Sequence, residues 1–274
     1  MTRTECSGKR FISVVSVENR RIVIIGAGNM ATSLAMALKK SGNAPAAVWS
    51  RTVASAKQLG TLVGCLYTNE LSELPPADVV IISVVDSALR EMASAAARLF
   101  PNALILHTAG SIPMNALHEA GAARYGVFYP MQTMSKQNIV PFDNVTIFIE
   151  SHNEADREYL HSLASSLSGK VVYATSEQRF SLHVAAVFSC NFPNALYTMA
   201  CEILERSGLP FDSMLPLIDE AAKKVHRMPP LAAQTGPAKR GDHNVMNSHK
   251  AVLDDELSSV YSMMSEYIMK RSKI

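Results

Sequence analysis

Gly26, Gly28 and Ala31 form a GxGxxA pattern, and these residue types at this spacing are suited to holding phosphate groups. The pattern follows the β-branched run 22–25 and opens a stretch, 31–38, whose apolar residues recur at helical spacing. In such a unit the first glycine permits a tight turn, and the second lets a pyrophosphate approach the backbone. The N–H groups at the helix N-terminus then attract phosphate oxygens. An ordinary strand-to-helix turn is the alternative, but the order of elements favours a dinucleotide site made of Gly26, Gly28, Asn29, Met30 and Ala31.

The residues after the next predicted strand, 46–49, indicate which dinucleotide would bind. In a chain that binds NAD, an acidic residue about 20 positions after the glycine turn contacts the ribose 2′-hydroxyl. The region 43–60 contains neither Asp nor Glu, and Ser50, Arg51 and Thr52 follow the strand instead. Hydroxyl and guanidinium groups favour a 2′-phosphate. We therefore predict NADP as the cofactor, with a solvated loop arginine as the alternative.

Another apolar run, 77–85, predicts a buried strand that ends near the same site. In open α/β sheets, ligands bind beyond the carboxyl ends of the strands. Ser83, Val84 and Val85 are therefore predicted to line the nicotinamide ribose.

Hydride transfer also needs a proton donor and groups that stabilise developing charge. His183 and Asn191 lie two turns apart within a predicted helix, 180–208, so they should share a face with Asn194 close to it. We predict that His183 and Asn191 are catalytic and that Asn194 binds substrate. The alternative is a buried structural histidine, with both asparagines satisfying the bend that Pro193 imposes.

Three further residues are candidates for the same chemistry. His107 follows a predicted strand, 103–106, and is a third catalytic candidate, with a structural turn as the alternative. Arg240, within KRGD, is predicted to anchor a substrate carboxylate or phosphate, because a guanidinium binds such groups bidentately. The alternative is a solvated charge in a loop. His249 is predicted to bind substrate in the same cleft, with a surface position as the alternative.

Strand and helix signals alternate up to residue 176 and predict a doubly wound, mostly parallel α/β sheet of about eight strands. From residue 177 the strand signal disappears. Helices are predicted at 180–208, from near Asp212 to before Pro229, and from Asp242 as N-cap to about Lys270. The predicted organisation is an N-terminal extension (1–19), a nucleotide-binding domain (20–176) and an all-α C-terminal domain (177–274).

Composition excludes several classes of protein. The net charge of the 274 residues is only +2, with no block of like charge, so we expect no nucleic-acid partner. No apolar run approaches the roughly 20 residues that a membrane span requires, so we expect no membrane partner. The 4 cysteines form no CxxC pair or metal-like cluster. They are typical of reduced thiols in a cytoplasmic protein without a metal site.

Several stretches together resemble the superfamily of pyrroline-5-carboxylate reductase and 6-phosphogluconate dehydrogenase. They are VIIGAGNMA, SRT, ADVVIISV and HTAGS, followed by the helical half. HVAAVFSCNFPNAL and TGPAKRGDHNVMNSH resemble a narrower branch, provisionally named NADP oxidoreductase, that pairs a Rossmann-like domain with a C-terminal domain of unknown function. The resemblance implies a homodimer, with the helical domains packed together and the active cleft between the nucleotide-binding and helical domains, the latter a substrate and dimerisation domain. Relatives often have His-Pro where this chain has Tyr129-Pro130.

These inferences predict an NADP-dependent oxidoreductase that transfers a hydride between the nicotinamide and a small, anionic carbonyl or imine substrate. The alternative is a non-catalytic sensor of NADP(H) or a metabolite. In several members of the superfamily the corresponding helix supplies a catalytic lysine, and the helix predicted at 180–208 contains none. Tyr129 also favours a sensor, since it replaces a histidine of the relatives.

Overall fold

The computed structural model describes residues 20–272, so the predicted extension 1–19 lies outside the described residues. The chain divides into two compact units after Val187. The first unit contains an eight-stranded sheet in the order β3-β2-β1-β4-β5-β6-β7-β8. Its strands are β1 (Ile22–Ile25), β2 (Ala47–Trp49), β3 (Leu66–Thr68), β4 (Val79–Ile82), β5 (Leu104–His107), β6 (Arg124–Met131), β7 (Thr146–Ser151) and β8 (Val171–Tyr173).

The sheet is mostly parallel, as predicted. Strands β1 to β6 pair in parallel, β7 pairs antiparallel with β6, and β8 pairs in parallel with β7. Every residue of β1 and β4 is buried, which explains their continuous β-branched sequences, because a central parallel strand is covered on both faces.

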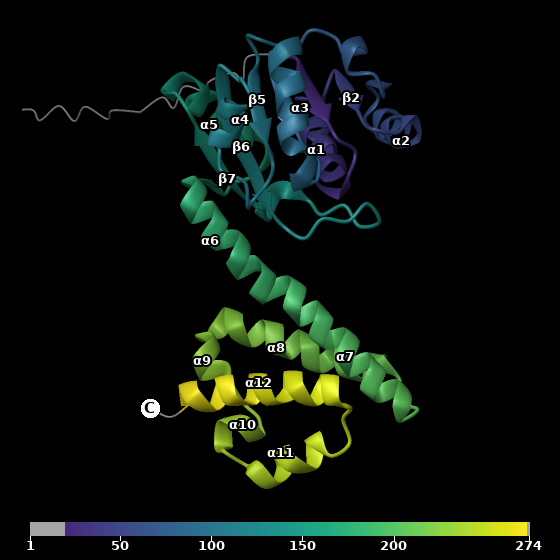
Figure 1. Cartoon of the computed structure of the whole chain (residues 1–274), viewed down its shortest axis with the longest axis vertical. Coiled ribbons are helices and arrows are strands. Elements are labelled where there is room, and N and C mark those ends of the chain that lie inside the picture. Colours follow the sequence, from purple (N-terminus) through teal and green to yellow (C-terminus); the bar gives the residue numbers. More distant parts are fainter. Residues whose placement is uncertain (1–19, 273–274) are drawn as a thin grey trace, which may run out of the picture. The chain divides into compact units, whose positions relative to one another are not determined.

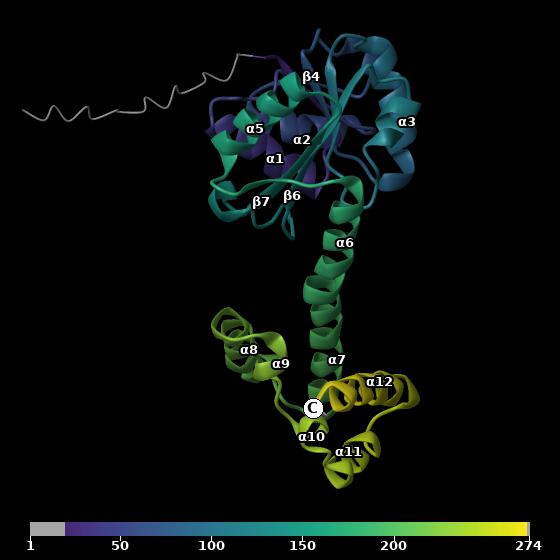
Figure 2. The ribbon, with the colours of Figure 1, turned by 90° about the vertical axis from the view of Figure 1, so that its left-hand side faces the viewer.

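Helices cover both faces of this sheet, so the prediction of a doubly wound fold is confirmed (Figures 1 and 2). One apolar cluster joins α1, α2 and α5 to one face, and a second joins α3 and α4 to the other. A third, smaller cluster packs Leu182 of α6 against Val127, Tyr129 and Phe148. The helices of this unit are α1 (Asn29–Lys40), α2 (Val53–Val63), α3 (Asp86–Leu99), α4 (Asn115–Glu119), α5 (Glu154–Leu167) and α6 (Ser176–Ala186).

The second unit is helical, as predicted for the C-terminal domain. The division falls after α6, whereas the predicted boundary at residue 176 lies before that helix. A π-helical turn (Val187–Asn191) follows α6. The remaining α-helices are α7 (Phe192–Arg206), α8 (Leu215–Arg227), α9 (Pro230–Ala233), α10 (Pro237–Arg240), α11 (His243–Lys250) and α12 (Asp255–Ser272).

The helix predicted at 180–208 is present, since residues 176–206 are helical throughout as α6, the π-helical turn and α7. The π-helical turn ends two residues before Pro193, the residue that was expected to disturb the helix. One prediction about these helices was wrong. Asp242 caps α11 through the Val245 N–H, at 3.2 Å, and does not cap the last helix. That helix starts after Asp254, whose carboxylate accepts from the Leu257 N–H at 2.9 Å.

The second unit has little core of its own within the described residues. Helices α7 and α8 contain no buried residue, and the buried apolar side chains are Ala238, Met246 and Leu257. Large apolar side chains are exposed instead, among them Leu217 and Met263, each 66% exposed. None of the helices between residues 20 and 272 combines the length and apolar character needed to cross a membrane.

Candidate functional site

Gly26 is required by the fold itself. Its φ of +126° lies in a region that L side chains rarely adopt, and its N–H donates to the Trp49 carbonyl at 2.8 Å. A Cβ atom at this position would lie 2.0 Å from the Ser83 carbonyl oxygen. The glycine therefore lets β1 turn sharply while packed against the end of β4.

Gly28 differs from Gly26 because nothing in the protein requires a glycine there. Its φ of −77° and ψ of −172° suit any residue, and a Cβ atom would meet nothing within 4 Å. It is the N-cap of α1, where no side chain accepts a hydrogen bond from the first-turn N–H groups of Asn29, Met30 and Ala31. The absent side chain leaves open space above these donors, which fits the approach of a dinucleotide pyrophosphate.

The end of β2 presents the residues predicted to select the nucleotide. Thr52 caps α2 by accepting a hydrogen bond from the Ser55 N–H at 3.4 Å. Arg51 is exposed, and no ion pair engages it within residues 20–272. Ser50 is half-buried, and its N–H donates to the Thr68 carbonyl at 3.2 Å. The guanidinium of Arg51 is therefore available to an anionic ligand, and Thr52 has a structural role in addition to any binding role.

The carboxyl ends of β4 and β5 are polar and partly open. The Thr108 hydroxyl donates to the buried Ser83 hydroxyl at 3.0 Å, which joins the two strand ends. Val84 is half-buried, whereas Val85, the N-cap of α3, is 69% exposed. An exposed apolar side chain beside the glycine turn fits contact with a ligand, because burying Val85 under a flat ring would remove its surface from water.

Tyr129, His183 and Gly110 meet within the first unit. The Tyr129 hydroxyl lies 3.4 Å from Nδ1 of His183, and a Cβ atom on Gly110 would lie 2.8 Å from that nitrogen. Burial raises the pKa of Tyr129, and the Arg179 cation offsets part of this rise, so the hydroxyl is protonated at neutral pH. The arrangement pairs a half-buried imidazole with a neutral hydroxyl. Tyr129 therefore contacts the predicted catalytic histidine.

His107 is fully buried at the end of β5. Its Nδ1 accepts a hydrogen bond from the Ala109 N–H at 3.2 Å. Desolvation, with repulsion from the Arg179 cation, lowers the pKa of His107 to about 3. A buried imidazole that is neutral at physiological pH is a poor proton donor, and the structure gives it the position of a backbone-anchoring residue.

This burial makes the stability of the fold depend on pH through His107. The unfolded chain binds a proton near the ordinary pKa of 6.5, whereas the folded chain does so only near about 3. We expect stability to fall as pH drops below 6.5, with this residue contributing about 1.4 kcal/mol per pH unit. Urea unfolding between pH 7.5 and pH 5 measures the effect. In His107→Asn, whose amide oxygen replaces the Nδ1 acceptor, the pH dependence should be shallower, and equal slopes would contradict the assignment.

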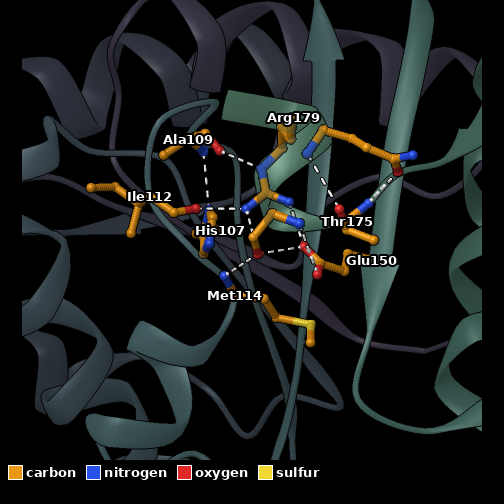
Figure 3. A network of polar contacts seen from close by, with 9 residues as sticks. His107, Ala109, Ile112, Met114, Glu150, Thr175 and Arg179 are labelled. Carbon is orange, nitrogen blue, oxygen red and sulfur yellow. Dashed lines mark hydrogen bonds and ion pairs between the residues drawn. The ribbon is translucent and has the colours of Figure 1, made fainter. Parts of the chain in front are cut away.

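Arg179 is the centre of a buried polar network that sequence reasoning missed (Figure 3). Its guanidinium donates to the carbonyls of Ala109 and Ile112, at 3.3 and 2.6 Å, and pairs with Glu150 at 2.5 Å. Ser176 completes the network by donating to Glu150 at 2.8 Å. Arg179 immediately precedes the helix predicted at 180–208 and ends the polar stretch 175–179, so nothing in the local sequence marks it as buried.

The other four predicted residues lie in the second unit. Asn191 ends the π-helical turn, and Asn194 lies on α7, where both side chains are exposed. Arg240 is exposed at the end of α10, and His249 on α11 contacts the Tyr261 hydroxyl at 2.9 Å. The argument that His183 and Asn191 share a face assumed an uninterrupted α-helix, and the π-helical turn now lies between them. Their association with the residues of the first unit stays a prediction.

The sheet order, the glycine turn and the helical second unit define a Rossmann-type α/β protein with an all-α C-terminal unit. Two family profiles match the chain. Residues 9–100 match the shikimate/quinate 5-dehydrogenase family, and residues 145–268 match a domain of unknown function, DUF2520. No curated protein has significant sequence similarity to the chain.

Solved structures define the relationship further. A Bacteroides fragilis protein, provisionally named an NADP oxidoreductase, is 48% identical, with a TM-score of 0.88 over 93% of this chain and 100% of its own. The chain therefore belongs to the family of that protein, in which DUF2520 follows a Rossmann-type domain. An Aspergillus terreus reductive aminase, solved with NADPH and ethyl levulinate, shares the fold at 21% identity and a TM-score of 0.65, over 92% of this chain and 94% of its own. So does a Coxiella burnetii pyrroline-5-carboxylate reductase, at 17% identity and a TM-score of 0.57, over 93% and 98%.

Proposed function

We propose that the protein is an NADP-dependent oxidoreductase that reduces a small carbonyl or imine compound, or catalyses the reverse oxidation. Two observations together carry the proposal. The fold has room for a side chain at Gly28, yet the residue is a glycine. The exposed guanidinium of Arg51 has no ion-pair partner within residues 20–272. Gly28 leaves room for the pyrophosphate, and Arg51 pairs with the adenosine 2′-phosphate. The related structure named an NADP oxidoreductase supports the cofactor.

Reduction of a carbonyl or imine adds a hydride to the carbon and a proton to the oxygen or nitrogen, and NADPH supplies the hydride when bound. His183 supplies the proton. In the imidazolium form its Nδ1–H donates to the Tyr129 oxygen, 3.4 Å away, while Nε2 transfers its proton to the substrate. The neutral ring that remains keeps its proton on Nδ1. Tyr129 therefore fixes the tautomer, and His107 supports the backbone at Ala109.

The second unit supplies the remaining substrate contacts in this proposal. Arg240 pairs with a carboxylate or phosphate on the substrate, because its guanidinium is exposed. Asn191 and Asn194 donate hydrogen bonds to the substrate oxygen, and His249 binds the substrate, as predicted from the sequence. The protein acts in the cytoplasm, consistent with its unpaired thiols at Cys65, Cys190 and Cys201.

A homodimer is part of the proposal. Helices α7 and α8 bury no residue, and their exposed apolar side chains include Leu196, Leu217 and Val225. Apolar helix faces of this extent are stabilised by a partner, and a second copy provides matching faces. Analytical ultracentrifugation should show a dimer, and a monomer at micromolar concentration would contradict this part.

The test of the proposed function separates an enzyme from a sensor. The protein is mixed with NADPH and a panel of 2-keto acids, neutral ketones and cyclic imines, and loss of the NADPH absorbance is followed. We expect multiple turnovers with at least one compound. Stoichiometric binding of NADPH without turnover across the panel would favour the sensor.

A further inference from the structure

We propose that Arg179 is a positioning residue that fixes the segment around Gly110 against α6 and thereby places His183 beside Tyr129. This inference rests on the proposed function for its catalytic consequence, but the positioning itself concerns the protein without cofactor. Within residues 20–272 no hydrogen bond joins Arg179 to Tyr129 or His183, so apart from the effect of its charge on Tyr129 it acts through the backbone that it holds.

The three nitrogens of the guanidinium contact two segments, 109–112 and β7. Nε donates to the Ala109 carbonyl at 3.3 Å, and Nη2 donates to the Ile112 carbonyl at 2.6 Å. These two carbonyls flank Gly110, so the glycine is held from both sides. Nη1 pairs with Glu150 of β7 at 2.5 Å, which fixes the orientation of the guanidinium itself. A planar fork suits this task because its donors have a fixed geometry, which a lysine ammonium lacks.

The start of α6 is tied to the same network. Glu150 accepts hydrogen bonds from the Ser176 backbone N–H at 3.1 Å and from its hydroxyl at 2.8 Å. That hydroxyl in turn accepts from the Met114 N–H at 2.9 Å. The helix that carries His183 therefore starts on the carboxylate that pairs with Arg179.

The consequence for His183 follows from helical spacing and close packing. Arg179 and His183 are four residues apart on α6, so they lie one above the other on the same face. Their helix contacts Gly110 so closely that an added Cβ would lie 2.8 Å from Nδ1 of His183 and 2.9 Å from Cζ of Tyr129. A shift of the 109–112 segment therefore moves the surface against which both rings pack.

The competing explanation is that the Arg179–Glu150 ion pair only stabilises the fold. Such a pair would not need the hydrogen bonds to the 109–112 segment and to the start of α6. Arg124 and Asp156 form such a pair elsewhere in the first unit, where the carboxylate is 1% exposed, as the Arg179 side chain is in its own pair. Arg124 bonds to the carbonyl of Asn102 and to Asp156, and not to the 109–112 segment. It serves as the matched control for loss of a partly buried ion pair.

The experiment compares Arg179→Lys and Glu150→Gln with Arg124→Lys, all in the full-length chain. Histidine ring signals are recorded by nuclear magnetic resonance on protein labelled with ¹⁵N-histidine, and His183→Asn identifies the signal of His183 among the 8 histidines. NADPH affinity and, on a substrate from the panel, kcat and KM are measured in parallel. Arg179→Lys keeps the charge, so it yields a folded comparison if Glu150→Gln does not fold.

We expect the His183 ring signals to move in Arg179→Lys and Glu150→Gln and to stay unchanged in Arg124→Lys. We also expect kcat to fall about tenfold to a hundredfold, since small displacements of a reacting group cost this much, with NADPH affinity within about twofold of wild type. A folded Arg179→Lys protein with wild-type His183 signals would overturn the positioning role. If the wild-type protein turns over no compound, the proposed function fails, whereas the ring signals still decide whether Arg179 positions His183.

Discussion

Replacing His183 with asparagine should lower kcat about a hundredfold to a thousandfold, because a positioned proton donor contributes about 10²–10⁴-fold to such reactions. The residue is half-buried and contacts the Tyr129 hydroxyl, and within residues 20–272 no hydrogen bond joins it to the glycine turn of the dinucleotide site. Its removal should therefore leave NADPH affinity unchanged. Stopped-flow measurement of NADPH oxidation under saturating substrate separates the chemical step from binding.

Two variants accompany this measurement. Tyr129→Phe keeps the packing against Phe148 and removes only the hydroxyl, so we expect a smaller loss of about tenfold through the unfixed tautomer. His118, an exposed histidine of α4, serves as the control, and His118→Asn should react like wild type. Wild-type kcat in His183→Asn would remove this residue from the mechanism.

Substitution by alanine should have different effects at the two glycines of the turn, lowering NADPH affinity at Gly28 and fold stability at Gly26. Gly28→Ala places a methyl group in open space at ordinary backbone angles, so we expect the fold to lose only about 0.5 kcal/mol from the changed N-cap. The methyl group would occupy the approach of the pyrophosphate. NADPH affinity should therefore fall at least about tenfold, which corresponds to 1.4 kcal/mol.

Gly26→Ala should instead damage the fold. The φ of +126° is strained for alanine, and the new Cβ would lie 2.0 Å from a backbone oxygen of Ser83. Strain of this kind costs about 1–3 kcal/mol before the steric clash is added. Urea unfolding and NADPH titration of both variants provide the comparison. Equal losses of stability, or unchanged NADPH affinity in Gly28→Ala, would show that Gly28 does not contact a ligand.

Sequence patterning predicted the sheet well because a strand that is buried on both faces has a continuous apolar sequence. The strands at 22–25 and 79–82 are continuous apolar runs, which a central parallel strand requires. The turn at Gly26 could also be predicted, since its positive φ strongly favours glycine over residues with a side chain. Local constraints of this kind need no knowledge of distant contacts.

The polar parts of the candidate site were harder to predict, because they depend on contacts between distant segments. Arg179 bonds to residues 67 and 70 positions away, and no local pattern reports such a partner. His107 was placed correctly at a strand end, but its pKa is lowered by burial and also by the Arg179 cation, which comes from the distant helix α6. The π-helical turn also escaped notice, since residues 187–191 have the composition of an ordinary helix.

The central claim is that the glycine turn binds a dinucleotide whose 2′-phosphate pairs with Arg51. Calorimetric titration of the wild-type protein and of Arg51→Glu with NADPH and NADH tests it most directly, with quenching of the single tryptophan, Trp49, as a second readout beside the site. We predict that wild type binds NADPH at least about tenfold more tightly than NADH, because charge-assisted hydrogen bonds to a phosphate contribute about 1.5–3 kcal/mol, and that Arg51→Glu loses this preference. Equal or tighter binding of NADH by wild type, or no binding of either, would contradict the account.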